Sequence, residues 1–132
     1  MPTRALLLTL LLASPISGRA EDLILLLQQR NCVGCHLEDV DLVHADLRNA
    51  DLQRAQLQRA NLGQARLDGS DLRKSNLQFT NLRGASLRGA DLRGSTLYGT
   101  DLRQADLSGA QLDDTALEQA HWQARGSRSS SA

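Results

Sequence analysis

A leucine recurs at every fifth position through most of the chain, and this spacing limits the possible folds more than any other feature. The interval is unbroken from Leu37 to Leu117, and Trp122 takes the next position in the series. The chain can therefore be divided into five-residue words with the leucine at the centre. The first letter is usually small and the second is usually Asp or Asn, as in Ala45 and Asp46. Such regularity predicts a repeat architecture.

A period of five fits neither a helix nor a long strand. An α-helix turns by about 500° over five residues, so the leucines would wind around every side of it. In a strand, successive leucines would point to opposite faces. A chain with a short extended piece and a corner in each word satisfies the pattern, because four words then close a square coil. The central leucines and small first letters point inward, and each coil buries its core by stacking on the next.

These words, of the form A(D/N)Lxx, resemble the pentapeptide-repeat family and cover 90 of the 132 residues. The resemblance implies an all-β solenoid, a right-handed quadrilateral β-helix of about 4.5 coils over residues 32–124. It implies no enzymatic reaction. The family includes DNA-mimicking proteins that bind gyrase, so a topoisomerase binder of that type is one alternative function.

Residues 1–20 are typical of a secretory signal peptide. They combine an early Arg4, an apolar run over residues 5–13 and small residues up to Ala20, after which we expect cleavage. The apolar run is too short for a permanent transmembrane helix, and an uncleaved N-terminal anchor is the alternative. We therefore expect an exported protein with no stable membrane insertion after cleavage. Its compartment would be the periplasm or an equivalent oxidising one.

The charge of the chain is balanced, with 15 basic and 15 acidic residues. The predicted leader contains Arg4 and Arg19 and no acidic residue, so its removal leaves 13 basic against 15 acidic residues. This balance describes neither a polyanion nor a basic nucleic-acid binder. Together with the leader it weakens the alternative of DNA mimicry, and we expect no nucleic-acid partner.

Residues 21–31 are predicted to form a short helix that caps the first coil. Asp22 can serve as its N-cap, and Leu23, Leu26 and Leu27 recur at helical spacing. A solenoid needs such a cover, because its first coil would otherwise expose its core to water. A membrane-surface helix is the alternative, but it would want more Lys or Arg than this segment supplies.

The motif Cys32-Val33-Gly34-Cys35-His36 is the one group of residues in the sequence that could form a reactive or cofactor-binding site. Cys-x-x-Cys-His in an exported protein is the attachment sequence for c-type haem, with the two thiols as thioethers and the histidine as an iron ligand. In the five-residue register, however, both cysteines point inward and His36 points outward. Two inward thiols suit a disulfide that pins the first turn, and a redox-active or metal-binding thiol pair is a third interpretation. Several exported pentapeptide-repeat proteins are similar in opening the repeat with a paired-cysteine word, which favours the disulfide.

A haem would also lack a second axial ligand. Met1 is the only methionine and leaves with the leader, while His121 lies about 20 Å from His36 at the usual strand spacing. His44 is closer, but it points outward beside no evident pocket. We therefore predict no cofactor and no metal. The alternative is an electron carrier that bears haem c on Cys32 and Cys35, with His36 as an iron ligand.

Residues twenty apart should stack on one face of the solenoid. On one face, opposite charges such as Asp46 and Arg66 would then meet between coils. On another, a ladder of aspartates would need nearby cations or backbone amides to offset its repulsion, and each Asp or Asn can also hydrogen-bond its own turn. The aspartates are Asp51, Asp71 and Asp91.

A third face is nearly uncharged at its middle and carries Phe79 and Tyr98 on adjacent coils. These are the only outward aromatic residues of the repeat. Aromatic side chains on a polar face are typical anchors for a protein partner, although scattered surface aromatics are also common. Phe79 and Tyr98 are therefore the candidate partner-binding residues.

The last letter of the later words is usually glycine, which tolerates a tight corner with positive φ. The earlier words carry other residues there, from which we expect a different turn type. These residues are Asn49, Arg54, Arg59 and Gln64.

No catalytic constellation appears in the chain, and we predict that it is not an enzyme. Neither a Ser-His-Asp set, nor a phosphate-binding loop, nor four-ligand zinc spacing is present. We predict a non-enzymatic module that binds or scaffolds an unknown protein partner. Trp122 could cover the far end of the stack or support a homodimer there, and residues 125–132 should be disordered.

Overall fold

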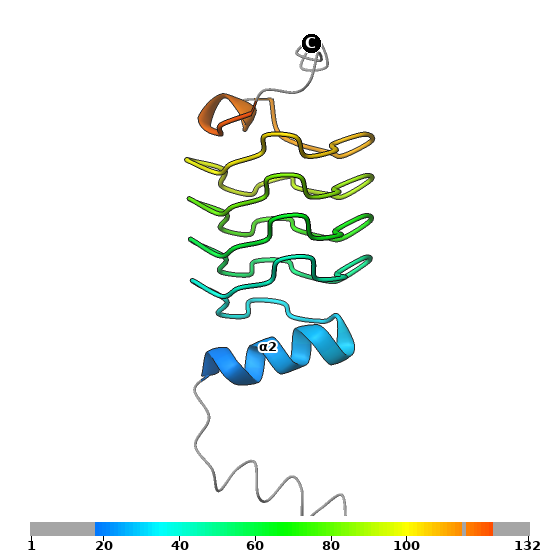
Figure 1. The fold of residues 1–132 in the computed structure, drawn as a ribbon, viewed down its shortest axis with the longest axis vertical. Coiled ribbons are helices and arrows are strands. Elements are labelled where there is room, and N and C mark those ends of the chain that lie inside the picture. Colours follow the sequence, from blue (N-terminus) through cyan, green and yellow to red (C-terminus); the bar gives the residue numbers. More distant parts are fainter. Residues whose placement is uncertain (1–17, 115, 123–132) are drawn as a thin grey trace, which may run out of the picture.

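The computed structural model describes residues 18–114 and 116–122. Its helices are α2 (Gly18–Gln29) and a short 3-10 helix, η1 (Leu117–Gln119). Figure 1 shows a stack of coils with α2 lying across one end and η1 at the other. Residues 1–17 of the predicted leader and the predicted tail over residues 125–132 lie outside the described residues.

The coils are held together by parallel β-bridges between residues twenty apart. Asn31 pairs with Asp51, Asp51 pairs with Asp71, and the other faces repeat this spacing. Each bridge is a single residue on each side, so the ladders consist of bridges and not of long strands. Next to the bridge the Leu52 N–H donates to the Asp71 carbonyl at 2.8 Å. The five-residue period therefore closes a four-sided coil, as the sequence predicts.

The central leucines form one continuous core. From Leu37 to Leu102 each is at most 4% exposed, and most of the small first letters are buried beside them. At the C-terminal end the core is less covered, because Leu107, Leu112 and Trp122 are only partly buried. Burying each of the inner leucines contributes about 1.5–3 kcal/mol, so the ladder of leucines is the main source of stability.

The words that end between Gly34 and Gly109 close with a β-turn, and the turn is the same with and without glycine. In a representative turn the Ala55 N–H donates to the Leu52 carbonyl at 3.1 Å. Every fifth residue from Gly34 to Gly109 has φ between 58° and 76°, which is the pattern of a type II turn. The expectation of a different turn in the early words is therefore wrong. The residues concerned have φ of 58–61°: Asn49, Arg54, Arg59 and Gln64.

The Asp or Asn in second position stabilises its own turn, as predicted. Its Oδ1 atom accepts a hydrogen bond from the N–H two residues later, for example from Arg73 to Asp71 at 3.2 Å and from Gly63 to Asn61 at 3.1 Å. This satisfies a backbone donor that the ladder leaves free at the corner. The frequency of Asp and Asn in the repeat follows from this bond.

The helix differs from its prediction in three respects. It begins at Gly18 and ends at Gln29, where residues 21–31 were expected. Asp22 lies inside it and is not the N-cap. Only Leu26 of its leucines is fully buried, while Leu27 is 51% exposed. The sequence of an apolar helix does not specify which side packs against the core. The expected apolar side therefore included Leu27, which is exposed.

Candidate functional site

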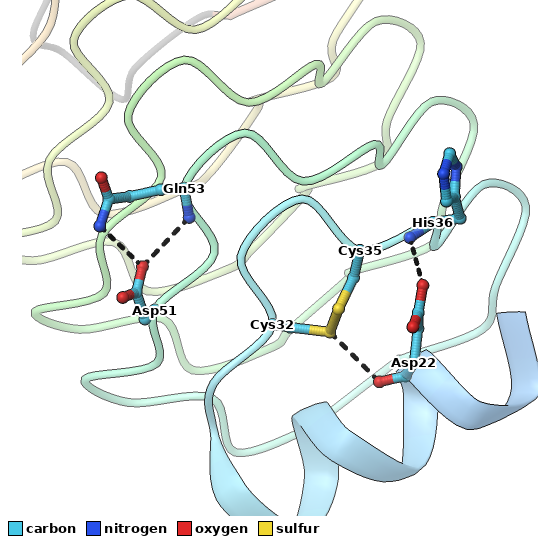
Figure 2. Close-up of a disulfide and its surroundings, with 6 residues drawn as sticks. All are labelled: Asp22, Cys32, Cys35, His36, Asp51 and Gln53. Atoms are coloured by element: carbon cyan, nitrogen blue, oxygen red, sulfur yellow. Dashed lines mark hydrogen bonds between the residues drawn. A yellow bond between two sulfur atoms is a disulfide. The ribbon is translucent and has the colours of Figure 1, made fainter. Parts of the chain in front are cut away.

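Cys32 and Cys35 lie at the junction between α2 and the first coil. Figure 2 shows them as a bonded pair, and their Sγ atoms are 2.05 Å apart. Cys32 is 1% exposed and Cys35 is 6% exposed, in agreement with the inward register. The pair therefore lies under the helix as part of the core.

Asp22 joins the helix to this coil. Its Oδ2 atom accepts a hydrogen bond of 2.6 Å from the His36 N–H (Figure 2). In the next coil the equivalent N–H, that of Gln56, donates to the Cys35 carbonyl of the preceding coil at 2.8 Å. The first coil has no preceding coil, and the Asp22 carboxylate takes the place of that missing carbonyl. Sequence reasoning missed this role; the available signal was the short Asp22 side chain directly before the apolar helical run.

The backbone of Asp22 also approaches the cysteine pair. Cys32 Sγ is 3.2 Å from the Asp22 carbonyl oxygen. A disulfide sulfur carries no proton, so this is a close contact while the cysteines are bonded, and only a reduced thiol could donate here.

His36 faces away from the sulfur atoms. Its side chain is 68% exposed, and Nδ1 lies 3.5 Å from Glu38 Oε2. The pKa of Glu38 is lowered, mainly by a hydrogen bond from its own backbone and further by the His36 ring. Two inward sulfurs and an outward imidazole do not face a common space, so these residues do not fit a c-type haem. Over the described ranges, no group of three or more His, Cys, Asp or Glu side chains is placed to hold a metal ion.

Phe79 and Tyr98 meet on the face whose words are centred on Leu37, Leu57, Leu77 and Leu97, which we call the aromatic face. Their ring centroids are 5.5 Å apart in an edge-to-face arrangement. Both side chains remain open to solvent, with Phe79 55% and Tyr98 56% exposed. Adjacent coils bring them together, because the Phe79 N–H donates to the Tyr98 carbonyl at 3.0 Å.

A glycine makes room for the Phe79 ring. A Cβ atom at Gly99 would lie 2.6 Å from two carbons of that ring. The two aromatic residues and Gly99 therefore form one packed unit on the surface. Sequence reasoning found the two rings but missed this contact.

The surroundings of the two rings carry little charge. The second-position residues along the aromatic face stack as a neutral ladder after the first coil, and Asn76 Oδ1 accepts from the Gln78 N–H at 3.0 Å. Arg59 lies nearer the N-terminal end and pairs with Asp39 at 2.8 and 3.0 Å. The hydrogen bond from Arg59 lowers the pKa of Asp39. The middle of this face is therefore apolar and amide-rich.

Most close ion pairs on the other faces join two residues of the same word. This differs from the prediction, which placed them between neighbouring coils. The arginine reaches back to the aspartate two residues before it, with Nε and a terminal nitrogen both donating. The distances are 2.6–2.8 Å in Asp46–Arg48, Asp71–Arg73, Asp91–Arg93 and Asp101–Arg103. Contacts between coils are fewer, such as Arg88–Asp106 at 3.6 Å, and no Asp46–Arg66 pair is formed among the described residues.

The repulsion between the stacked aspartates is offset by neighbouring hydrogen-bond donors, as predicted. Arg73 and Arg93 pair with the second and third aspartates, and Gln53 Nε2 donates to Asp51 at 3.0 Å. The hydrogen bond from Arg73 lowers the pKa of Asp71. The acidic groups of this face are therefore not an unpaired anionic surface.

The architecture and its repeat match a known family. The model of pentapeptide repeats matches residues 31–69, 50–89 and 85–121, with eight copies. The chain belongs to the pentapeptide-repeat family. Proteins of this family fold as right-handed quadrilateral β-helices and are generally non-enzymatic structural or binding modules.

Several solved pentapeptide-repeat proteins are similar to the chain. HetL, involved in heterocyst differentiation regulation in the cyanobacterium Nostoc sp. strain PCC 7120, is 32% identical over 69% of this chain, with a TM-score of 0.46. The chain spans only 46% of the HetL chain. The protein alr5209 from Nostoc PCC 7120 is 30% identical over 83% of this chain and 99% of its own, with a TM-score of 0.38.

A third pentapeptide-repeat protein comes from the thylakoid lumen of Arabidopsis thaliana. It is 23% identical over 74% of this chain and 70% of its own, with a TM-score of 0.32. No curated protein matches the chain significantly. No helix within the described residues is long and apolar enough to cross a membrane.

Proposed function

We propose that this pentapeptide-repeat protein is an exported, non-enzymatic module that binds a protein partner through the aromatic face. The observation that carries the proposal is the Phe79–Tyr98 pair, two packed aromatic rings that remain more than half exposed. Interface hot spots are enriched in such aromatic side chains, surrounded by contacts that exclude water. The neutral amides beside the rings can be desolvated at lower cost than charges.

The remaining surface supports protein binding over DNA mimicry. A DNA mimic needs a row of unpaired negative charges to match phosphates. Here the aspartates of the charged ladder are paired with Arg73 and Arg93. Export, with cleavage after Ala20, is part of the same proposal and would remove the first turn of α2.

The ends of the solenoid have their own proposed roles. We propose that α2 caps a stack of about 4.5 coils, since Leu26 is buried in the core and Asp22 satisfies an edge N–H. At the other end, partly buried Trp122 is the candidate for a C-terminal homodimer contact.

We propose that the cysteine pair is a structural disulfide in the exported protein and that no haem is attached. The intact mass and visible spectrum of protein exported in cells with c-haem maturation machinery test this. A colourless protein that starts at Glu21 and resists alkylation of its cysteines until reduced is expected. A red protein heavier by one haem would overturn the assignment.

The partner-binding proposal is tested by site-specific photo-crosslinking in the native cell envelope. The photo-reactive residue replaces Gln78, beside the rings, and in a matched control it replaces Arg88, on the opposite face. We expect a discrete adduct from position 78 and none of the same mass from position 88. The adduct should be lost in Phe79→Ser/Tyr98→Ser protein that keeps its circular dichroism spectrum. Equal adducts from both positions, or an adduct that survives the double substitution, would contradict the proposal.

A further inference from the structure

The side of α2 that faces away from the core is apolar. The helix exposes Ile24 (43%), Leu25 (39%) and Leu27 (51%). Ile24 lies almost opposite the fully buried Leu26, while Leu25 and Leu27 each lie about 100° around the helix from it. Large apolar side chains gathered on an exposed surface mark interaction sites. The solenoid end is already covered by the other side of the helix, so capping does not explain this outer side.

The polarity of the outer side is symmetric along the helix. Four residues lie along it at intervals of three, one and three positions: Glu21, Ile24, Leu25 and Gln28. Their order is polar, apolar, apolar, polar. All four are at least partly exposed. Residues at this spacing share one face of a helix. Reversing the helix direction leaves the order of polarity unchanged, so the surface is complementary to a reversed copy of itself.

We propose that the outer side of α2 is a self-association surface on which two copies pack with their helices antiparallel. Such a contact is isologous, since the same patch serves both subunits. Ile24 of each copy meets Leu25 of the other, and Leu27 flanks this centre. At each end the Glu21 carboxylate can accept a hydrogen bond from the Gln28 amide of the other copy. The antiparallel helix dipoles also attract each other.

The charges around the helix favour a second copy over a lipid surface. A membrane-binding helix places Lys or Arg beside its apolar side, where they meet anionic headgroups. Arg19 belongs to the leader that we propose is cleaved after Ala20, so the exported protein would lack it. Arg30, directly after α2, is engaged with the solenoid, because it lies 3.3 Å from Asp46 and donates to the Arg48 carbonyl.

The contact is small, and its expected strength follows from that. Two short helices bury less than the roughly 1,200–2,000 Å² of a standard stable interface. We therefore expect a weak dimer whose population rises with protein concentration. Joined end to end, two solenoids would present two aromatic faces to a partner.

The test is sedimentation velocity over a concentration series, using the exported protein as isolated. The variants Ile24→Glu and Leu25→Lys each place a charge against the apolar centre of the other copy. We expect each variant alone to associate at least about tenfold more weakly than the wild type, because two unpaired charges would be buried. Gln29→Glu, on an exposed position beside the outer stripe, is the matched control and should associate like the wild type.

An equimolar mixture of the two variants decides the geometry. In an antiparallel pair, the introduced glutamate of one copy faces the introduced lysine of the other while the remaining contact stays apolar, so the mixture should recover association. A parallel pair brings no such opposite charges together. Circular dichroism should confirm that the exposed substitutions leave the fold intact. Residues 24 and 25 remain in the chain whether or not the leader is cleaved after Ala20.

Several outcomes would overturn the proposal. They are a wild-type protein that stays monomeric at every concentration, variants that associate as well as the wild type, and a mixture that fails to recover association. Continued association of the variants would point to the Trp122 end. Flotation of the monomeric wild type with vesicles of phosphatidylcholine and phosphatidylglycerol, lost in Ile24→Glu, would assign the helix to a lipid surface.

Discussion

The fifth residue of each five-residue word shows how packing between coils overrides the backbone preference of a single residue. Lys74 and Phe79 adopt φ of 60° and 58°, a region that costs a non-glycine residue about 1–2 kcal/mol. They accept this strain because the turn sets up the hydrogen bonds to the neighbouring coils. Glycine at the same position avoids the strain, and alanine substitutions measure it.

Gly89→Ala and Gly99→Ala should destabilise the protein by different routes. Both residues have positive φ, 68° and 71°, so each variant should lose about 1 kcal/mol from backbone strain. A Cβ at Gly89 meets nothing within 4 Å, whereas a Cβ at Gly99 would lie 2.6 Å from the Phe79 ring. Urea unfolding should show a larger loss for Gly99→Ala, and only that variant should change the near-ultraviolet signal of Tyr98. Equal losses with unchanged spectra would contradict this reading of the aromatic unit.

Acid should weaken the protein through its paired aspartates. The hydrogen bond from Arg73 holds the pKa of Asp71 below its usual value in the folded state. At acid pH the unfolded chain therefore binds more protons, so this contribution is complete above the unfolded pKa of about 3.9 and is lost as pH falls through the folded pKa. Asp71→Asn should reduce the drop in the urea midpoint between pH 7 and pH 3. An unchanged drop would show that the pair does not contribute to acid sensitivity.

At the scale of elements, the junction between α2 and the first coil depends on Asp22. Asp22→Ala leaves the His36 N–H without its acceptor, and we expect a loss of about 1 kcal/mol. Asp22→Asn keeps an acceptor oxygen and should lose less. Hydrogen exchange should accelerate at the His36 amide in the alanine variant and remain unchanged at Gln56, whose acceptor is the Cys35 carbonyl. Uniform acceleration along the chain would instead indicate a global effect.

The repeat could be predicted from the sequence because its signal is periodic and its partners are fixed by spacing. A leucine such as Leu77 points inward wherever the five-residue register holds, and its burial is confirmed. The turn at Arg54 could not be predicted, since its positive φ is imposed by neighbouring coils and not by the residue.

The burial pattern of the helix and the contacts of the site were harder to predict, because tertiary packing also decides them. Leu26 and Leu27 are identical in type, and only the tertiary packing decides that one is buried and the other exposed. The contact of Asp22 with His36 joins residues from different elements, and no repeat spacing links them. Phe79 and Tyr98 could be placed together because both lie within the repeat, where residues near twenty apart are neighbours.

At the scale of the whole molecule, the protein is a one-dimensional stack in which each coil contacts only its neighbours. The stability of such a stack is the sum of the coils and the interfaces between them. The position of a substitution along the axis should therefore matter as much as its chemistry. Leu77 is fully buried near the middle, whereas Leu112 is only partly buried near the C-terminal end.

Leu77→Ala should lower the free energy of unfolding by about 2–5 kcal/mol, because coils on both sides surround the cavity. Leu112→Ala should cost less, since its side chain already contacts solvent. Trp122, the only tryptophan, reports on the C-terminal end by fluorescence, while far-ultraviolet circular dichroism reports on the whole stack. For the wild type we expect the two urea transitions to coincide. In Leu77→Ala the weakened central interface should uncouple the two halves and separate the transitions. Coincident transitions in that variant would show that the stack unfolds as one unit even when its middle is weakened.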